Sequence, residues 1–176
     1  MKIIQTKLNG VYTIELEPRE DSRGYFARIF AKEELKKAEI DFSIVHINRS
    51  LSKEKGVIRG MHYQKSPWRE DKIIQCLSGK IFDVVLDLRK NSKTFGQWVG
   101  KVIDPGNKKM MLIPKGCAHG FQTLEKNTTV EYFVTQYYAP EFEKGVRYND
   151  PLFKIKWPIK NAIVSEKDAN WPLYKR

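Results

Sequence analysis

Few residues of this sequence have side chains that could take part in catalysis by proton transfer. It contains only three histidines, His46, His62 and His119, and each falls in a strand-like segment or at the edge of a turn. Two cations, Arg59 and Lys72, stand near His62 in the sequence. A histidine can take a proton from carbon, a lysine can stabilise the resulting oxyanion, and a tyrosine can return a proton. Together these residue types favour proton transfer at a carbon atom.

Other kinds of active site have less support. Metal-binding β-barrels usually present two histidines separated by one residue, but Gln64 and Phe121 stand at the matching positions after His62 and His119. We therefore expect no metal and no other cofactor. No GxSxG, P-loop or GxGxxG motif occurs. Cys117 lies two residues before His119, and we expect a buried, inert thiol there.

The expected strands decide which of these side chains can cooperate. In the segment Val57–Gln64, strict alternation puts His62 on one face and Arg59 on the other, unless Gly60 forms a bulge that redirects one of them. Lys72 opens the next strand-like run. It is either a strand-end lysine that reaches water or a cation that points inward.

Short runs rich in β-branched and aromatic residues are typical of strands. We predict strands over Val11–Leu16, Ser43–Ile47, Val57–Gln64, Ile73–Leu77, Ile81–Leu88, Met110–Ile113, Phe121–Leu124 and Val130–Tyr138. In the last strand Tyr132 and Tyr138 would share a face. An amphipathic helix is predicted over Ala31–Ala38. Turn signals recur about every ten to seventeen residues, so the pattern indicates an all-β sandwich or barrel with few helices.

Composition limits the class of protein. The chain has 176 residues with 32 Lys or Arg and 21 Asp or Glu, a formal net charge of +11. The length fits a single domain spanning residues 1–176. No apolar run approaches the roughly 20 residues that span a bilayer, so we expect a cytoplasmic protein without a membrane partner. Acidic residues interrupt the lysines, as in Lys53–Lys55, which argues against a nucleic-acid partner.

A series of motifs extends from about Val11 to Trp171, which is nearly the whole chain. They are Asp21–Phe26, Asn48–Ser50, Arg59–Gln64, Asp87–Arg89, Thr94–Trp98, Ile113–Phe121, Tyr148–Pro151, Ile155–Pro158 and Ser165–Asp168. In their order and spacing these motifs resemble the dTDP-4-dehydrorhamnose 3,5-epimerase family. The resemblance implies a cupin-like jelly-roll barrel, and a homodimer in which an N-terminal strand crosses to the partner.

The same resemblance implies an activity and four catalytic roles. The activity is cofactor-free epimerisation of a nucleotide-linked 4-keto-6-deoxyhexose, first of all of dTDP-4-dehydro-6-deoxy-D-glucose to dTDP-4-dehydro-L-rhamnose. His62 matches the family's general base, and Asp168 matches the carboxylate that orients it. Tyr132 matches the general acid, and Lys72 matches a cation near the keto oxygen.

Further positions match residues that hold the nucleotide, the diphosphate or the sugar. They are Arg23, Phe26, Asn48, Arg59, His119, Tyr138, Glu143 and Lys167. Two positions depart from the family pattern, because Arg28 replaces the usual Glu and His46 replaces the usual Gln. Both belong to the expected nucleotide or sugar pocket. The departures motivate the hypothesis that the base is not thymine, which a comparison of dTDP, CDP, UDP and GDP affinities would test.

Three other functions stay open at this stage. The first is a mono-epimerase acting at C3 or C5 alone, and the second is a 3,4-ketoisomerase that moves the carbonyl group. The third is a non-catalytic module that binds a nucleotide sugar. Product analysis separates the enzymes, since an epimerase leaves the carbonyl at C4, and a binding module exchanges no protons with solvent.

Overall fold

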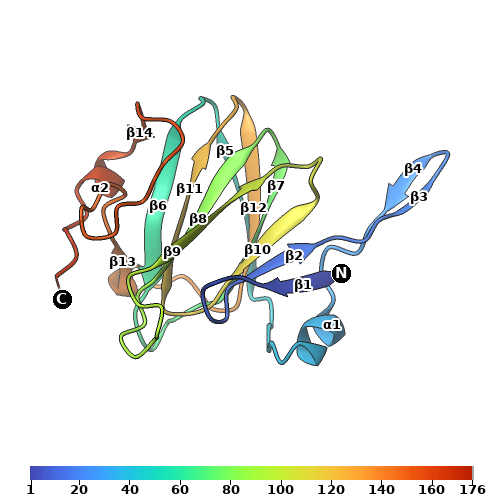
Figure 1. Cartoon of the computed structure of the whole chain (residues 1–176), viewed down its shortest axis with the longest axis horizontal. Helices are drawn as coiled ribbons and strands as arrows, with labels where there is room; N and C mark the ends of the chain where they lie inside the picture. Colours follow the sequence, from blue (N-terminus) through green and yellow to red (C-terminus); the bar gives the residue numbers. More distant parts are fainter. Residues whose placement is uncertain (176) are drawn as a thin grey trace.

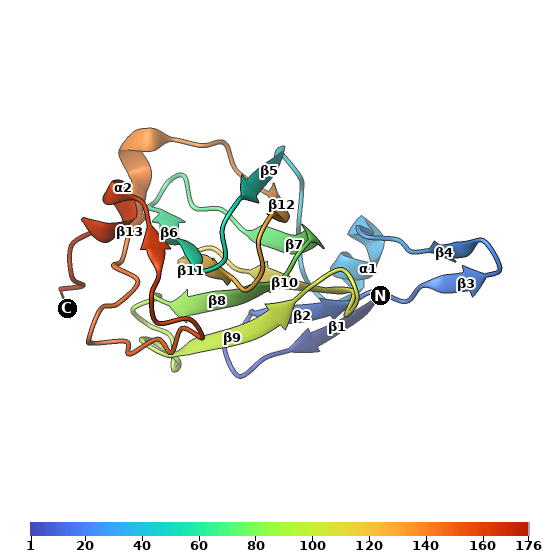
Figure 2. The same ribbon diagram turned by 90° about the horizontal axis from the view of Figure 1, so that it is seen from above.

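A computed structural model describes residues 1–175 of the chain. Its regular structure is mostly antiparallel, with two main sheets that face each other (Figure 1, Figure 2). The first sheet has the order β1 (Lys2–Gln5), β2 (Tyr12–Glu15), β10 (Lys109–Ile113), β7 (Lys72–Ser78), β12 (Thr128–Val134) and β5 (His46–Ser52). The second has the order β13 (Glu143–Gly145), β6 (Val57–Gln64), β11 (Cys117–Thr123), β8 (Ile81–Asp87) and β9 (Trp98–Ile103), and β14 (Ile163–Val164) pairs in parallel with β6.

The main core fills the space between the two sheets. Ile74 and Met111 of the first sheet pack with Val85 and Ile103 of the second, and all four are fully buried. Burial of each such side chain contributes about 1.5–3 kcal/mol relative to leaving it exposed. The predicted strands therefore form two sheets that bury apolar side chains between them.

The helix α1 (Lys32–Lys37) covers the opposite, outer face of the first sheet. Its one buried residue, Leu35, packs with Phe42 and with Ile14, Ile73 and Phe133 of the sheet. The predicted helix over Ala31–Ala38 is confirmed, because these two alanines are its cap residues. The only other helices within residues 1–175 are the short η1 (Pro140–Phe142) and α2 (Glu166–Ala169). Neither these nor α1 is long and apolar enough to cross a membrane.

A separate hairpin projects from the sheets. Its strands β3 (Arg19–Asp21) and β4 (Gly24–Phe26) pair only with each other and extend beyond the rest of the molecule (Figure 1, Figure 2). The aromatic residues Tyr25 and Phe26 are 59% and 64% exposed. Large apolar side chains on a projecting hairpin have no core of their own to enter.

The all-β class with a few short helices is confirmed, and the expected barrel takes the form of two facing sheets. The strand predicted over Val57–Gln64 coincides with β6. The predicted strands that correspond to β2, β7, β8 and β10 differ from them by one residue at one or both ends. The prediction for Val130–Tyr138 is wrong at its end, since β12 stops at Val134. Tyr138 therefore lies beyond the strand. The predictions for Ser43–Ile47 and Phe121–Leu124 are wrong in their bounds, since β5 runs from His46 to Ser52 and β11 begins at Cys117. The strands β1, β3, β4, β9, β13 and β14 are absent from the predictions.

Candidate active site

A bulge in β6 places Arg59 and His62 on the same side of the sheet. His62 pairs with His119 of β11, and Arg59 pairs with Phe121, so three steps along β6 match two steps along β11. A side chain at Gly60 would collide with the backbone of Gly120, and Gly60 has a φ of 129°. Glycine is thus required where the two strands approach most closely. The conditional expectation of a bulge is confirmed.

His62 forms a close pair with Asp168. The His62 Nε2 and Asp168 Oδ1 atoms are 2.6 Å apart, and the backbone N–H of Gly60 donates to Asp168 Oδ2 at 3.2 Å. Asp168 lies in α2, whose first turn is capped by the hydroxyl of Ser165 accepting from the Asp168 N–H. Burial acts to raise the pKa of Asp168, but hydrogen bonds from His62 and from the Gly60 amide outweigh burial and lower the pKa. Asp168 is therefore a carboxylate positioned to orient the imidazole.

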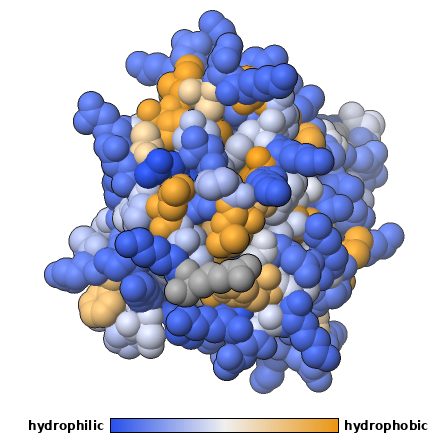
Figure 3. Space-filling view, turned by 60° about the vertical axis from the view of Figure 1, so that its left-hand side comes forward, coloured by the Kyte–Doolittle hydropathy of each residue, from blue (hydrophilic) through white to orange (hydrophobic). Residues whose placement is uncertain are grey.

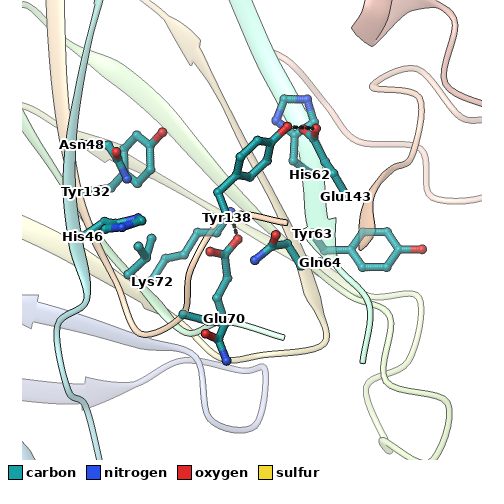
Figure 4. Close-up of a pocket in the computed structure, with 12 residues that line it drawn as sticks. His46, Asn48, His62, Tyr63, Gln64, Glu70, Lys72, Tyr132, Tyr138 and Glu143 are labelled. Atoms are coloured by element: carbon teal, nitrogen blue, oxygen red, sulfur yellow. Dashed lines mark hydrogen bonds and ion pairs between the residues drawn. The ribbon is translucent and has the colours of Figure 1, made fainter. Parts of the chain in front are cut away.

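The facing sheet supplies the other side of the cleft. Tyr132 of β12 pairs with Asn48 of β5, and two residues further along Val134 pairs with both His46 of β5 and Lys72 of β7. Residues two apart on a strand share a face, so these side chains form one surface. Figure 4 shows His46, Asn48 and Tyr132 on one side of the cavity and His62 on the other. Burial raises the pKa of Tyr132, which keeps its hydroxyl protonated and able to donate.

Lys72 points inward, which decides between its two interpretations. Its side chain is only 14% exposed, and its ammonium group lies 3.0 Å from Glu70, a residue that also lines the cleft. Lys72 lies between the His46 side and the His62 side of the cavity (Figure 4). A buried ammonium in this place can stabilise negative charge on an oxygen bound in the cleft.

A second histidine–carboxylate pair lies beside the first. His119 Nε2 is 2.7 Å from Asp83 Oδ1, and Asp83 is fully buried. Because His119 pairs with His62 across β11 and β6, the two imidazoles enter the cleft from neighbouring strands. Sequence reasoning missed Asp83, although an acidic residue inside the apolar strand Ile81–Asp87 is a detectable signal that a buried partner is needed.

Glu143 joins two further binding candidates in one network. Its Oε2 accepts hydrogen bonds of 2.6 Å from both the Tyr138 hydroxyl and the Lys167 ammonium. Burial acts to raise the pKa of Glu143, but these two hydrogen bonds outweigh it and lower the pKa. The Glu143 hydrogen bond raises the pKa of Lys167, so both partners stay charged near neutral pH. Tyr138 thus reaches the cleft although it lies outside β12.

The cleft has two adjoining cavities of about 350 and 290 Å³ that share His62, Lys72 and Tyr132. Asn48, His46, Tyr138 and Glu143 line the first, whereas Arg59, His119, Lys167 and Asp168 line the second. The structure therefore brings together all four predicted catalytic residues and most of the predicted binding residues. Sequence reasoning also missed Glu70, Gln136 and Ser50, whose types carry no distinctive signal.

Three predicted binding residues lie elsewhere in this chain. Arg23 and Phe26 belong to the projecting hairpin, where Arg23 is 88% exposed and pairs with Asp21 at 2.6 Å. Arg28 follows the hairpin and lies 3.9 Å from Glu34 of α1. None of the three lines the cleft of its own chain.

The chemistry available in the cleft is proton transfer. Within residues 1–175 no cluster of three or more His, Cys, Asp or Glu side chains is arranged to hold a metal ion. Cys117 is buried, and burial raises the pKa of its thiol to about 12, which favours the protonated, less reactive thiol. A base, an acid and an ammonium group facing one cavity can remove a proton beside a carbonyl, stabilise the enolate and return a proton.

Comparison with known proteins agrees with this chemistry. A family model described as dTDP-4-dehydrorhamnose 3,5-epimerase matches residues 5–176. The enzyme of that name from Pseudomonas aeruginosa is 42% identical over 167 residues, covering 93% of this chain and 91% of its own length.

Solved structures give the same result. The Bacillus anthracis dTDP-4-dehydrorhamnose 3,5-epimerase with TDP and PPi bound has a TM-score of 0.95 and 41% identity, covering 98% of this chain and 99% of that one. The Legionella pneumophila dTDP-6-deoxy-D-glucose-3,5-epimerase in complex with dTDP-4-keto-L-rhamnose has a TM-score of 0.92 and 40% identity. The match covers 98% of this chain and 92% of that one. On this evidence the chain belongs to the dTDP-4-dehydrorhamnose 3,5-epimerase family of isomerases.

Proposed function

We propose that this protein epimerises dTDP-4-dehydro-6-deoxy-D-glucose at C3 and C5 and so produces dTDP-4-dehydro-L-rhamnose. The observation that carries the proposal is the placement of His62 and Tyr132 on facing sheets, with Lys72 between them. Inversion at carbon needs a base and an acid on opposite faces of the sugar ring. A cleft between two sheets supplies this arrangement directly.

The first step is removal of a proton from carbon. The C4 carbonyl acidifies the hydrogens at C3 and C5, and neutral His62 takes one of them while Asp168 holds the imidazole in orientation. The electron pair moves onto the C4 oxygen and forms an enolate. Lys72 is the cation that stabilises this oxyanion, and its burial strengthens the interaction.

The second step returns a proton from the other face. Tyr132 donates its hydroxyl proton to the carbon, and the enolate collapses to the ketone with the configuration inverted. Solvent reprotonates the tyrosinate and removes the proton from His62, so no proton is gained or lost overall. The same cycle at the second carbon completes the double epimerisation.

The nucleotide part of the substrate requires cations and aromatic surfaces. Arg59 and Lys167 in the cleft suit the diphosphate, since both donate to anionic oxygens and Arg59 can do so with two parallel bonds. We further propose that the protein is a homodimer in which the hairpin carrying Arg23 and Phe26 enters the partner's cleft. Its projection, and its exposed aromatic residues, support this assignment.

We retain dTDP as the nucleotide in spite of Arg28 and His46. Arg28 does not line the cleft of its own chain, whereas His46 does and stands edge-on to Tyr137. The relative complexes contain TDP or a dTDP sugar. Comparing the affinities for dTDP, CDP, UDP and GDP tests this choice: we expect a clear preference for dTDP, and a preference for another nucleotide would support the hypothesis of a different base.

Product analysis tests the proposed function. The protein is incubated with dTDP-4-dehydro-6-deoxy-D-glucose, and NMR of the product reports the configuration at C3 and C5 and the position of the carbonyl. We expect the L-rhamno configuration with the ketone still at C4. Inversion at only one carbon, a ketone at C3, or unchanged substrate would each refute the double epimerisation.

A further inference from the structure

Trp171 contacts the His62–Asp168 pair without lining the cleft. It lies two residues after α2, is half-buried, and borders a separate groove on the face where α2 and the C-terminal segment lie. Figure 3 shows the molecule from this side as a mostly hydrophilic surface with small hydrophobic patches. Trp171 lines neither cavity of the cleft, so its influence on the reaction is expected to act through the residues that it contacts, of which His62 and Asp168 are the catalytic candidates.

The indole shares an acceptor atom with His62. Its Nε1–H donates to Asp168 Oδ1 at 3.3 Å, and the same oxygen lies 2.6 Å from His62 Nε2. The His62 and Trp171 rings also meet edge to face, with centroids 6.3 Å apart and planes at 66°. Two donors thus converge on one carboxylate oxygen.

The indole is fixed in this position by its surroundings. It packs over Gly145, which pairs with His62 across β13 and β6, and a Cβ at Gly145 would collide with the ring atoms Cδ2, Cε2 and Nε1. The Arg147 side chain donates to the Trp171 carbonyl at 3.0 Å, and the Lys167 ammonium lies 5.8 Å from the ring centroid. The absence of a side chain at Gly145 is what admits a large ring beside His62.

We propose that Trp171 is a positioning residue for the epimerisation. Its indole N–H holds the Asp168 carboxylate in place and weakens the interaction between that carboxylate and the proton of His62. This inference rests on the catalytic role of His62 and Asp168 in the proposed function. A donor to Asp168 Oδ1 withdraws negative charge from the atom that stabilises protonated His62. The imidazole is then more often neutral, which is the form that can act as a base.

Other charged and titratable groups also surround His62. They are Glu143 of β13, Lys167 of α2, Arg59 of β6, the His119–Asp83 pair of β11 and β8, and Lys72, Tyr132, Tyr138 and Glu70 around the cleft. Trp171 differs from all of these because its side chain does not ionise. Replacing it by phenylalanine therefore removes one hydrogen bond and leaves the number of charges around His62 unchanged.

The variant Trp171→Phe tests the proposal, with Trp157→Phe as its matched control. Trp157 also donates its indole N–H to a single acceptor, the Tyr148 carbonyl at 2.8 Å, and packs in a different cluster. The titration of the His62 imidazole is followed by NMR in the full-length protein. In Trp171→Phe we expect the midpoint to move to higher pH by about half a unit, and the acid limb of kcat/KM to move with it. Trp157→Phe leaves both unchanged.

An unchanged or lower midpoint in Trp171→Phe would overturn the proposal and leave the indole with a packing role only. A measurement on the unaltered protein covers the case in which the variant fails to fold. The Trp171 indole proton resonance is expected to shift with the His62 titration, while the Trp157 resonance stays constant, and a pH-independent Trp171 resonance would contradict the proposal. These NMR results do not depend on turnover, so failure of the proposed function is detected separately.

Discussion

His62 and Tyr132 face each other from different sheets, and this separation predicts different defects when each is changed. His62→Asn removes the base and is expected to stop exchange of the C3 and C5 hydrogens with solvent, lowering kcat by roughly 10²–10⁴. Tyr132→Phe keeps the base, so exchange persists while inversion fails. NMR in deuterated water follows both processes. Equal loss of exchange in the two variants would contradict separate roles for base and acid.

Lys72 is expected to act on the reaction more than on binding. Lys72→Met keeps most of the length of the side chain but removes the charge that we propose stabilises the enolate oxygen, so kcat should fall by about 10²–10³ with a smaller change in KM. Lys144→Met is the matched control, because its ammonium donates to the Glu141 carbonyl and Lys144 lines neither cavity of the cleft. A change confined to KM in Lys72→Met would assign this residue to ground-state binding instead.

The loop after β8 depends on one buried carboxylate. Asp87 is fully buried and accepts hydrogen bonds from Arg89, Ser92 and Thr94. Burial acts to raise its pKa, but the hydrogen bonds outweigh burial and lower the pKa strongly. The ionised form is thus favoured in the folded state, and its contribution to stability is present above the unfolded pKa of about 3.9 and is lost as the pH falls below it.

Asp87→Asn tests this contribution. We expect the free energy of unfolding to fall by about 2–4 kcal/mol at pH 7, because Arg89 and the two hydroxyls lose their charged acceptor. The difference from the unaltered protein should shrink as the pH drops from 5 toward 3. Urea unfolding at a series of pH values measures this difference in the free energy of unfolding. A difference that does not depend on pH would show that the carboxylate charge is not responsible.

The strands could be predicted from the sequence because short runs rich in β-branched and aromatic residues favour strands, as in β6 and β8. The contacts between strands could not. Whether Arg59 and His62 share a face depends on the bulge opposite Gly120, a backbone contact between residues far apart in sequence. The role of Trp171 depends in the same way on its packing over Gly145. The types of residue near His62 favoured proton transfer at carbon, but the four catalytic roles and the substrate could be assigned only through the family resemblance.

Within residues 1–175 the projecting hairpin has no partner element in its own chain that would cover its exposed aromatic residues. If it enters the partner's cleft, mixing two inactive variants should restore activity. In a hybrid dimer of His62→Asn and Arg23→Ala subunits, one cleft keeps its own His62 and receives an intact Arg23 from the other subunit. Random mixing of equal amounts of the two variants is therefore expected to recover about a quarter of the activity of the unaltered protein. No recovery after verified subunit exchange would assign each hairpin to its own chain or to another role.

The central claim is that the cleft between the two sheets transfers protons at the carbons on both sides of a C4 carbonyl. The most direct measurement is incubation with dTDP-4-dehydro-6-deoxy-D-glucose in deuterated water, followed by NMR of the label at each carbon. Deuterium is expected at both C3 and C5 with the unaltered protein and at neither with His62→Asn. Absence of label at C3 and C5 with the folded, unaltered protein would contradict this claim.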